Sequence, residues 1–138
     1  MGKKMVILFI GLVLALAISL VGLKYIGLHI DNFDRQMEEI AVTNIDLSML
    51  ADGRYTGVGR LFLIFARVEV TVENGMIMAI EIMEHGNCRC AGAEGIIEHV
   101  IAGQTLKAGT ISDDSYSCKV ILKAIVNALE NAAKGSAR

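Results

Sequence analysis

Hydrophobic and polar positions change their spacing several times along the chain, and each change predicts a different element. Residues 5–23 are uncharged and almost wholly apolar. At about 1.5 Å per residue they form roughly 28 Å of helix, close to the hydrocarbon thickness of a bilayer. After this run, apolar residues recur at helical spacing among acidic ones. That second pattern, at Ile30, Phe33, Met37 and Ile40, predicts a short amphipathic helical stalk.

The middle of the chain alternates apolar and polar residues, which predicts half-buried strands. Residues 67–73 alternate valine with charged and hydroxyl side chains, and Asn74-Gly75 follows directly. This dipeptide is the strongest short signal of a hairpin because both residues tolerate a positive φ. On the return strand, the spacing predicts that Met78, Ile80 and Ile82 face the core. One apolar face per strand is typical of an antiparallel sheet that helices cover on one side.

The last third of the chain changes to helical spacing. Residues 91–103 place their large apolar side chains on one side, and a longer apolar stripe runs from Ser115 to about Ala133, with Asn127 and Asn131 predicted to face water. Strands come first and helices after, without βαβ alternation. This order predicts an α+β fold in which helices pack on one face of a small antiparallel sheet, preceded by one N-terminal transmembrane helix.

Three parts are expected: a transmembrane anchor at 1–27, the stalk at 28–45 and a folded domain at 46–138. Residues 5–23 also suit a signal peptide, but cleavage after a small-residue triplet such as Ala15-Leu16-Ala17 would leave an apolar N-terminus, which favours an uncleaved anchor. Two lysines precede the run and several acids follow it, so we expect a cytoplasmic N-terminus. The protein is then predicted to be single-pass in the cell membrane, with its C-terminal domain extracytoplasmic.

Charge and cysteine content exclude some classes of protein. The net charge is −2 and no basic patch appears, so nucleic-acid binding is not expected. The three cysteines are Cys88, Cys90 and Cys118. A Cys-x-Cys pair is too close in sequence to bridge easily, so either Cys118 bridges to one of the pair or all three stay thiols, and the sequence leaves both open. His85 with Cys88 and Cys90 is a weak metal pattern because structural zinc sites use longer paired spacings. No metal site is therefore assigned.

A cluster of hydroxyls and carboxylates precedes the last helix. The plainest interpretation is capping, in which side-chain oxygens accept from the unpaired N–H groups and acids complement the helix dipole. The start of a helix with small hydroxyl residues is also a natural phosphate-binding site. Asp113 and Asp114 are not expected to act as an acid/base pair, because adjacent residues at a helix start point in different directions.

Several segments, in their order and spacing behind one membrane helix, resemble the FMN-binding domain. This family occurs in membrane-anchored proteins and in the flavinylated subunits of sodium- or proton-coupled redox complexes. The resemblance covers about Asp46 to Ala133. Its matching segments are ADGRYTG at 51–57, VEVTVENGMIMAIEI at 68–82, Glu84-His85, Ala93-Glu94 with Ile96-Ile97, Gln104-Thr105-Leu106, and SYSCKVILKAIVNALENA at 115–132.

The family's signature before its last helix runs approximately Asp-x-x-Ser-Gly-Ala-Thr, one residue, then Ser/Thr-Ser-Lys. Its Thr can carry FMN through a phosphoester bond, and other members hold FMN without that link. On this chain the signature's Asp falls on Gly109, its Gly-Ala on two aspartates, and Cys118 replaces a usual Ser. The acceptor Thr falls on Ser115. The residues that the resemblance places at the cofactor are Ser112, Asp113, Asp114, Ser115, Tyr116, Ser117 and Lys119.

Asp113 and Asp114 are expected to weaken phosphate binding at this site. A carboxylate about 4 Å from a phosphate charge costs roughly 4 kcal/mol at an effective dielectric near 20, and about 1 kcal/mol if water intervenes freely. The attraction between the helix dipole and a charge stabilises by only about 0.3 to 1 kcal/mol per charge at an exposed site. Non-covalent FMN is therefore favoured over a covalent link, and loss of the flavin stays open.

The resemblance implies a non-catalytic FMN-binding domain that relays electrons between redox protein partners at the membrane surface. Two alternatives remain from the sequence. One is a flavin-free structural or interaction module of the same fold. The other is a thiol redox protein that uses the three cysteines.

Overall fold

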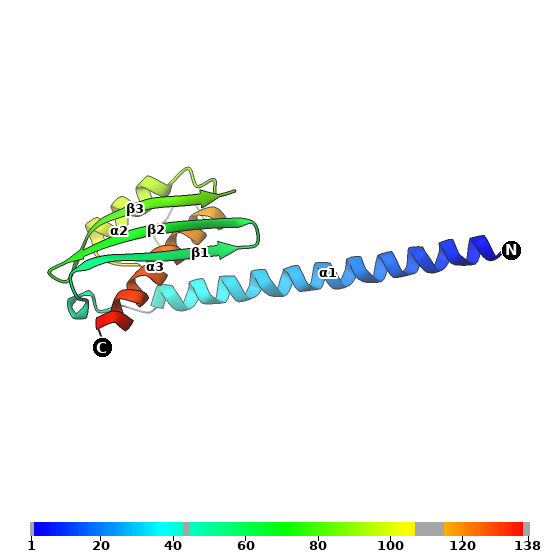
Figure 1. The fold of residues 1–138 in the computed structure, drawn as a ribbon, viewed down its shortest axis with the longest axis horizontal. Helices are drawn as coiled ribbons and strands as arrows, with labels where there is room; N and C mark the ends of the chain where they lie inside the picture. The colour runs from blue at the N-terminus through cyan, green and yellow to red at the C-terminus, as the bar shows by residue number, and fades with distance from the viewer. Residues whose placement is uncertain (1, 43–44, 107–114, 137–138) are drawn as a thin grey trace. The chain divides into compact units, whose positions relative to one another are not determined.

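The computed structural model describes residues 2–42, 45–106 and 115–136, except for the side chains of residues 40–42. It shows a three-stranded antiparallel sheet packed with helices and preceded by a long apolar helix (Figure 1). The predicted α+β fold class is thereby confirmed. The chain divides into two compact units, residues 1–35 and residues 36–138.

Helix α1 runs without a break over Lys3–Val42, so the segments predicted as anchor and stalk form one helix. Its stretch Lys3–Glu39 is long and apolar enough to cross a membrane, a test of length and composition that signal sequences pass as well. The second unit begins at Gln36, within the segment predicted as the stalk. Met37 of the apolar stripe is buried.

The sheet is a simple meander. Strands β1 (Gly53–Leu61), β2 (Ile64–Glu73) and β3 (Met76–Gly86) pair in chain order, with β2 in the centre (Figure 1). A short 3-10 helix, η1 (Leu47–Met49), precedes β1. Asn74 and Gly75 join β2 to β3 with φ of 53° and 72°, which confirms the hairpin that this dipeptide predicts.

Strand β3 contains two irregularities that change which side chains face the core. Val72 pairs with Ile77 while Thr71 pairs with Ala79, so Met78 has no partner across the strand. This bulge inverts the alternation: Ile77 is buried, whereas Met78 is 51% exposed. The prediction that Met78 faces the core is therefore wrong, because one extra residue moves the side chains beyond it to the other face.

Helix α3 (Tyr116–Ser136) supplies much of the core, and α2 (Ala93–Gly103) packs beside it. The predicted apolar stripe of α3 is buried along its length, at Val120, Ile121, Ala124, Ile125, Ala128, Leu129 and Ala132. The helix approaches β1 at two glycines. A Cβ built on Gly57 would lie 2.0 Å from the Ala124 carbonyl oxygen, and one on Gly59 would lie 2.0 Å from the Val120 carbonyl oxygen. Only glycine leaves room for a helix backbone this close to a strand.

Side-chain amides cover both edges of the sheet. On β1, Asn127 Nδ2 donates to the Val58 carbonyl at 2.7 Å and Asn131 Nδ2 donates to the Thr56 carbonyl at 3.0 Å. On β3, the Gln104 amide accepts from the Ile77 N–H at 2.7 Å and donates to the Ile77 carbonyl at 2.9 Å. The spacing predicts only that the asparagines face water. Their amides also satisfy edge groups that would otherwise pair with another chain.

Candidate functional site at the start of helix α3

Ser115 stands directly before α3 and caps it. Its Oγ accepts a hydrogen bond from the Cys118 N–H at 3.3 Å, and its carbonyl accepts from the Lys119 N–H at 3.1 Å. A serine hydroxyl bonded to the third N–H of a helix is the usual N-cap arrangement. The capping interpretation therefore accounts for Ser115. Ser112, Asp113 and Asp114, the other members of the predicted cluster, lie outside the described residues.

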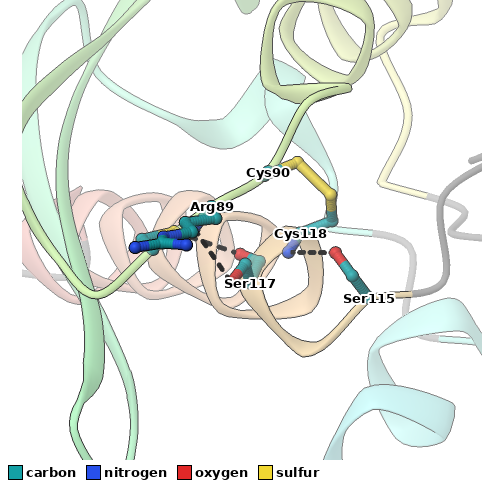
Figure 2. The surroundings of a disulfide bond; sticks show 6 residues. Arg89, Cys90, Ser115, Ser117 and Cys118 are labelled. Carbon is teal, nitrogen blue, oxygen red and sulfur yellow. Dashed lines mark hydrogen bonds between the residues drawn. A yellow bond between two sulfur atoms is a disulfide. The ribbon is translucent and has the colours of Figure 1, made fainter.

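The loop that follows β3 docks on the first turn of α3 through three consecutive residues. The Cys88 thiol donates to the Ser117 carbonyl at 3.4 Å, and the Arg89 N–H donates to Ser117 Oγ at 3.0 Å. Cys90 forms a disulfide with Cys118, their Cα atoms 5.0 Å apart (Figure 2). Of the pairings that the sequence leaves open, the structure has Cys90–Cys118, and Cys88 is free.

The described residues of the predicted cofactor site divide into two groups. Ser115 and Lys119 are half-buried, and Tyr116 is 37% exposed with its ring centroid 5.1 Å from Lys119 Nζ. Ser117, in contrast, is only 9% exposed, and its hydroxyl holds the backbone of Arg89. The structure thus brings Ser115, Tyr116 and Lys119 to the surface of one turn. It gives Ser117 a role in packing instead.

The cysteine-rich loop does not assemble a metal site among the described residues. The sulfur of Cys90 is bonded to the sulfur of Cys118 in the disulfide, so Cys90 has no thiolate that could bind a metal ion. Across the described parts of the chain, no group of three or more His, Cys, Asp or Glu side chains is arranged to hold a metal.

Cys88 is held as a protonated thiol. Burial raises its pKa above the ordinary value of 9.0, and a hydrogen bond to Ser117 acts in the opposite direction. The thiolate is the form that attacks a disulfide, so a thiol with a raised pKa is a weak nucleophile at neutral pH. Cys118 is also only 1% exposed, which shields its sulfur from attack. This geometry favours a structural disulfide over an exchanging one.

The raised pKa of Cys88 makes its alkylation slow. We expect iodoacetamide to modify Cys88 in the native protein more slowly at neutral pH than in the urea-unfolded chain, and the native rate to go on rising at alkaline pH after the rate of the unfolded chain has levelled off. The pKa of Cys88 is higher in the folded protein than in the unfolded chain. Its contribution to the free energy of unfolding is therefore complete below the unfolded pKa and is lost as the pH rises through the folded pKa. Intact-mass kinetics measure the rate. Equal rates in both states would contradict the burial of Cys88.

Sequence reasoning missed Arg89 and the docking of its loop. Nothing in the spacing of residues 86–92 assigns a contact to Arg89, and the signal that this loop reaches the start of α3 was the bridge from Cys118 to Cys88 or Cys90, which the sequence left open. It also missed a pocket of about 120 Å³ further along α3. Sites for drug-sized ligands usually measure about 300 to 1,000 Å³, so this pocket is too small for a nucleotide. Its lining residues are Gln36, Glu39, Ile45, Leu106, Lys123, Val126 and Glu130.

The disulfide also bears on where the folded unit resides. Disulfides persist in oxidising compartments and are rare in the cytosol of most organisms. Together with the apolar helix α1, the Cys90–Cys118 bond indicates an extracytoplasmic domain, secreted or anchored to a membrane.

Comparisons of the chain with protein-family models, with curated proteins and with solved structures find no match. The function is therefore inferred from the residues of this chain and from the motif order described above.

Proposed function

We propose that residues 46–138 form a non-catalytic FMN-binding domain that relays electrons between redox proteins at the extracytoplasmic face of the cell membrane. Helix α1 is its retained, single-pass anchor in this proposal. The observation that supports it is the first turn of α3. That turn is fixed by a cap and a disulfide, and it carries Ser115, Tyr116 and Lys119 at its surface.

The chemistry of this turn suits a phosphate group. The positive end of the α3 dipole and the Lys119 ammonium both attract an anion, and the hydroxyl groups of Ser115 and Tyr116 are hydrogen-bonding groups on the same turn. FMN, when bound, supplies the capacity to carry electrons one or two at a time. The chain's own contribution is to bind the phosphate end and hold the domain at the membrane.

The cap favours non-covalent binding. Ser115 Oγ accepts from the Cys118 N–H at 3.3 Å. Esterifying that oxygen with a bulky phosphate would disturb the cap, and a serine cap is worth about 1 kcal/mol. Ser117 is not assigned to the phosphate, because its hydroxyl is buried and bonded to the Arg89 N–H.

A flavin-free structural or interaction module of the same fold is the alternative, and it requires nothing of this turn beyond the cap and the disulfide. The thiol redox alternative is less favoured. It needs a reactive thiol beside an accessible disulfide, whereas Cys88 is protonated and Cys118 is buried.

Titration of FMN into the full chain in lipid nanodiscs tests the proposal. We expect the flavin fluorescence to change on binding, and Asp113→Gly with Asp114→Ala to tighten binding at least about fivefold, the factor that about 1 kcal/mol gives. Removing a carboxylate about 4 Å from a phosphate relieves roughly 1 to 4 kcal/mol, depending on how much water intervenes, and about 1.4 kcal/mol is a factor of ten.

The control is Asp31→Asn with Asp34→Asn, which removes the same net charge from α1. It should leave the affinity unchanged. If neither the natural chain nor the Asp113→Gly, Asp114→Ala variant binds FMN, the flavin proposal fails and the flavin-free module replaces it.

A further inference from the structure

The turn between β1 and β2 exposes two large apolar residues where polar ones are usual. Leu61 pairs with Ile64, so Phe62 and Leu63 alone form the connection. We call these two residues the hairpin tip. Phe62 is 45% exposed and Leu63 is 78% exposed. Two-residue hairpin loops normally carry Gly, Asn or Asp, so the tip contains neither the residues that favour the turn nor the residues that favour water.

The backbone of Phe62 adds a second departure. Its φ is 51°, in the left-handed region where a bulky residue is a genuine outlier. Backbone outliers of this kind cluster at active sites and ligand-binding sites. The turn is also held from outside, because Asn87 Nδ2 donates to the Leu63 carbonyl at 3.1 Å.

The charges near the tip are all positive in the two segments that meet there. From Gly57 to Ala66 the only charged side chain is Arg60, and from Gly86 to Ala91 the only one is Arg89. Both arginines are exposed. The Arg60 guanidinium lies 5.2 Å from the centroid of the Phe65 ring, which places this cation beside the apolar surface.

The tip lies at the end of the sheet where α3 begins. Asn131 bonds to Thr56 and Asn127 bonds to Val58, so β1 runs toward the tip as α3 runs back toward Tyr116. Residues 87–90, which bond to both the tip and the first turn of α3, lie at the same end.

We propose that the hairpin tip binds the interface of a lipid bilayer, with Phe62 and Leu63 at the boundary of the acyl chains and Arg60 and Arg89 at anionic phosphates. An apolar surface bordered by basic side chains is what such an interface attracts. The proposal rests on α1 being a retained anchor, and it does not depend on FMN.

The tether makes a bilayer a better occupant than a protein. Residues 24–35 separate the uncharged run from the second unit, about 18 Å of helix at 1.5 Å per residue. Strand β1 alone is about 30 Å long at 3.3 Å per residue, which exceeds the length of that helical spacer. Two side chains cannot supply the roughly 800 Å² per partner of a stable protein interface. A tethered domain needs little intrinsic affinity for its own membrane.

A single tryptophan reports the contact, since the chain contains none. The full chain with Phe62→Trp is reconstituted into vesicles of phosphatidylcholine and phosphatidylglycerol, with or without dibrominated acyl chains. We expect a blue-shifted emission that brominated lipid reduces by roughly half or more, as for a side chain at the acyl boundary. Leu63→Ser or Arg60→Gln, added to Phe62→Trp, should each weaken the quenching.

Met49→Trp is the matched control. Met49 is 74% exposed but belongs to η1, which lies beside the turn at Gly75, at the opposite end of the sheet. Its emission should stay red-shifted and insensitive to brominated lipid. If Phe62→Trp prevents folding, Leu63→Trp replaces it.

Quenching by iodide in the aqueous phase tests for the opposite outcome. If iodide quenches the Phe62→Trp reporter in vesicles as fully as the Met49→Trp reporter, the tip lies in water and the bilayer contact is overturned. The intact mass of the reconstituted chain shows separately whether residues 1–27 are retained, so loss of the anchor is not mistaken for failure of the tip contact.

Discussion

Replacing Gly57 by alanine is expected to destabilise the folded unit by more than about 3 kcal/mol, beyond the usual range for an inserted methyl group. The new Cβ would lie 2.0 Å from the Ala124 carbonyl oxygen and 2.3 Å from the Ala128 nitrogen. Both atoms belong to the α3 backbone, which cannot turn aside as a side chain can. The helix must move off β1, and the core between them opens. Urea unfolding of the full chain in detergent, followed by circular dichroism, measures the loss.

Gly95→Ala is the matched control for this prediction. Gly95 lies in α2, and a Cβ built there meets no atom within 4 Å. Alanine in an open helical position gains roughly 0.5 to 1 kcal/mol over glycine. The two substitutions add the same methyl group and should shift stability in opposite directions. A Gly57→Ala protein as stable as the natural chain would mean that α3 does not pack on β1 at this distance.

The elements of the fold that follow from local rules were predictable. Asn74-Gly75 specifies its hairpin because both residues accept a positive φ, and the structure shows them at 53° and 72°. The stripe of α3 follows from 3.6-residue periodicity, which identifies the buried face without knowledge of the partner. Each of these features depends on neighbours in sequence.

Features that depend on contacts between distant residues were not predictable. Met78 falls on the face that the alternation assigns to the core, yet a bulge sets it outside. The position of a bulge depends on what the two strands pack against, so the apolar and polar alternation of the strand does not predict it. The hydrogen bonds of Asn127 and Asn131 to the edge of the sheet also depend on contacts between distant residues. Helical spacing places them off the core, and only the structure shows the β1 carbonyls within reach.

The candidate site shows the same division. A cap formed by the hydroxyls and carboxylates before α3 follows from their position ahead of an apolar stripe, and the structure confirms it at Ser115. The choice between Cys88 and Cys90 as the partner of Cys118 could not be made from spacing, because both precede α3 by nearly the same number of residues. The docking of the loop decides it: Cys88 points its thiol at the Ser117 carbonyl, which leaves Cys90 beside Cys118.

This pairing makes the disulfide the second large contribution to stability. Cys90 and Cys118 are 28 residues apart in sequence. Closing a loop of that length restricts the unfolded chain by about 3 to 4 kcal/mol in the chain-entropy model. We therefore expect Cys90→Ala with Cys118→Ala to lower the free energy of unfolding by about that amount. Urea unfolding measures it, and reduction of the natural chain should bring its stability to the level of this variant.

Cys88→Ala separates the effect of this disulfide from the effect of removing cysteine as such. It keeps the Cys90–Cys118 bond and loses one weak hydrogen bond from the thiol to the Ser117 carbonyl, so its cost should stay near 1 kcal/mol or below. Hydrogen exchange should then accelerate at residues 88–90 and 115–119 in the Cys90→Ala, Cys118→Ala variant, because the covalent tie between loop and helix is gone, while Cys88→Ala leaves most of that protection. A Cys88→Ala protein as unstable as the double variant would instead assign the bond to Cys88.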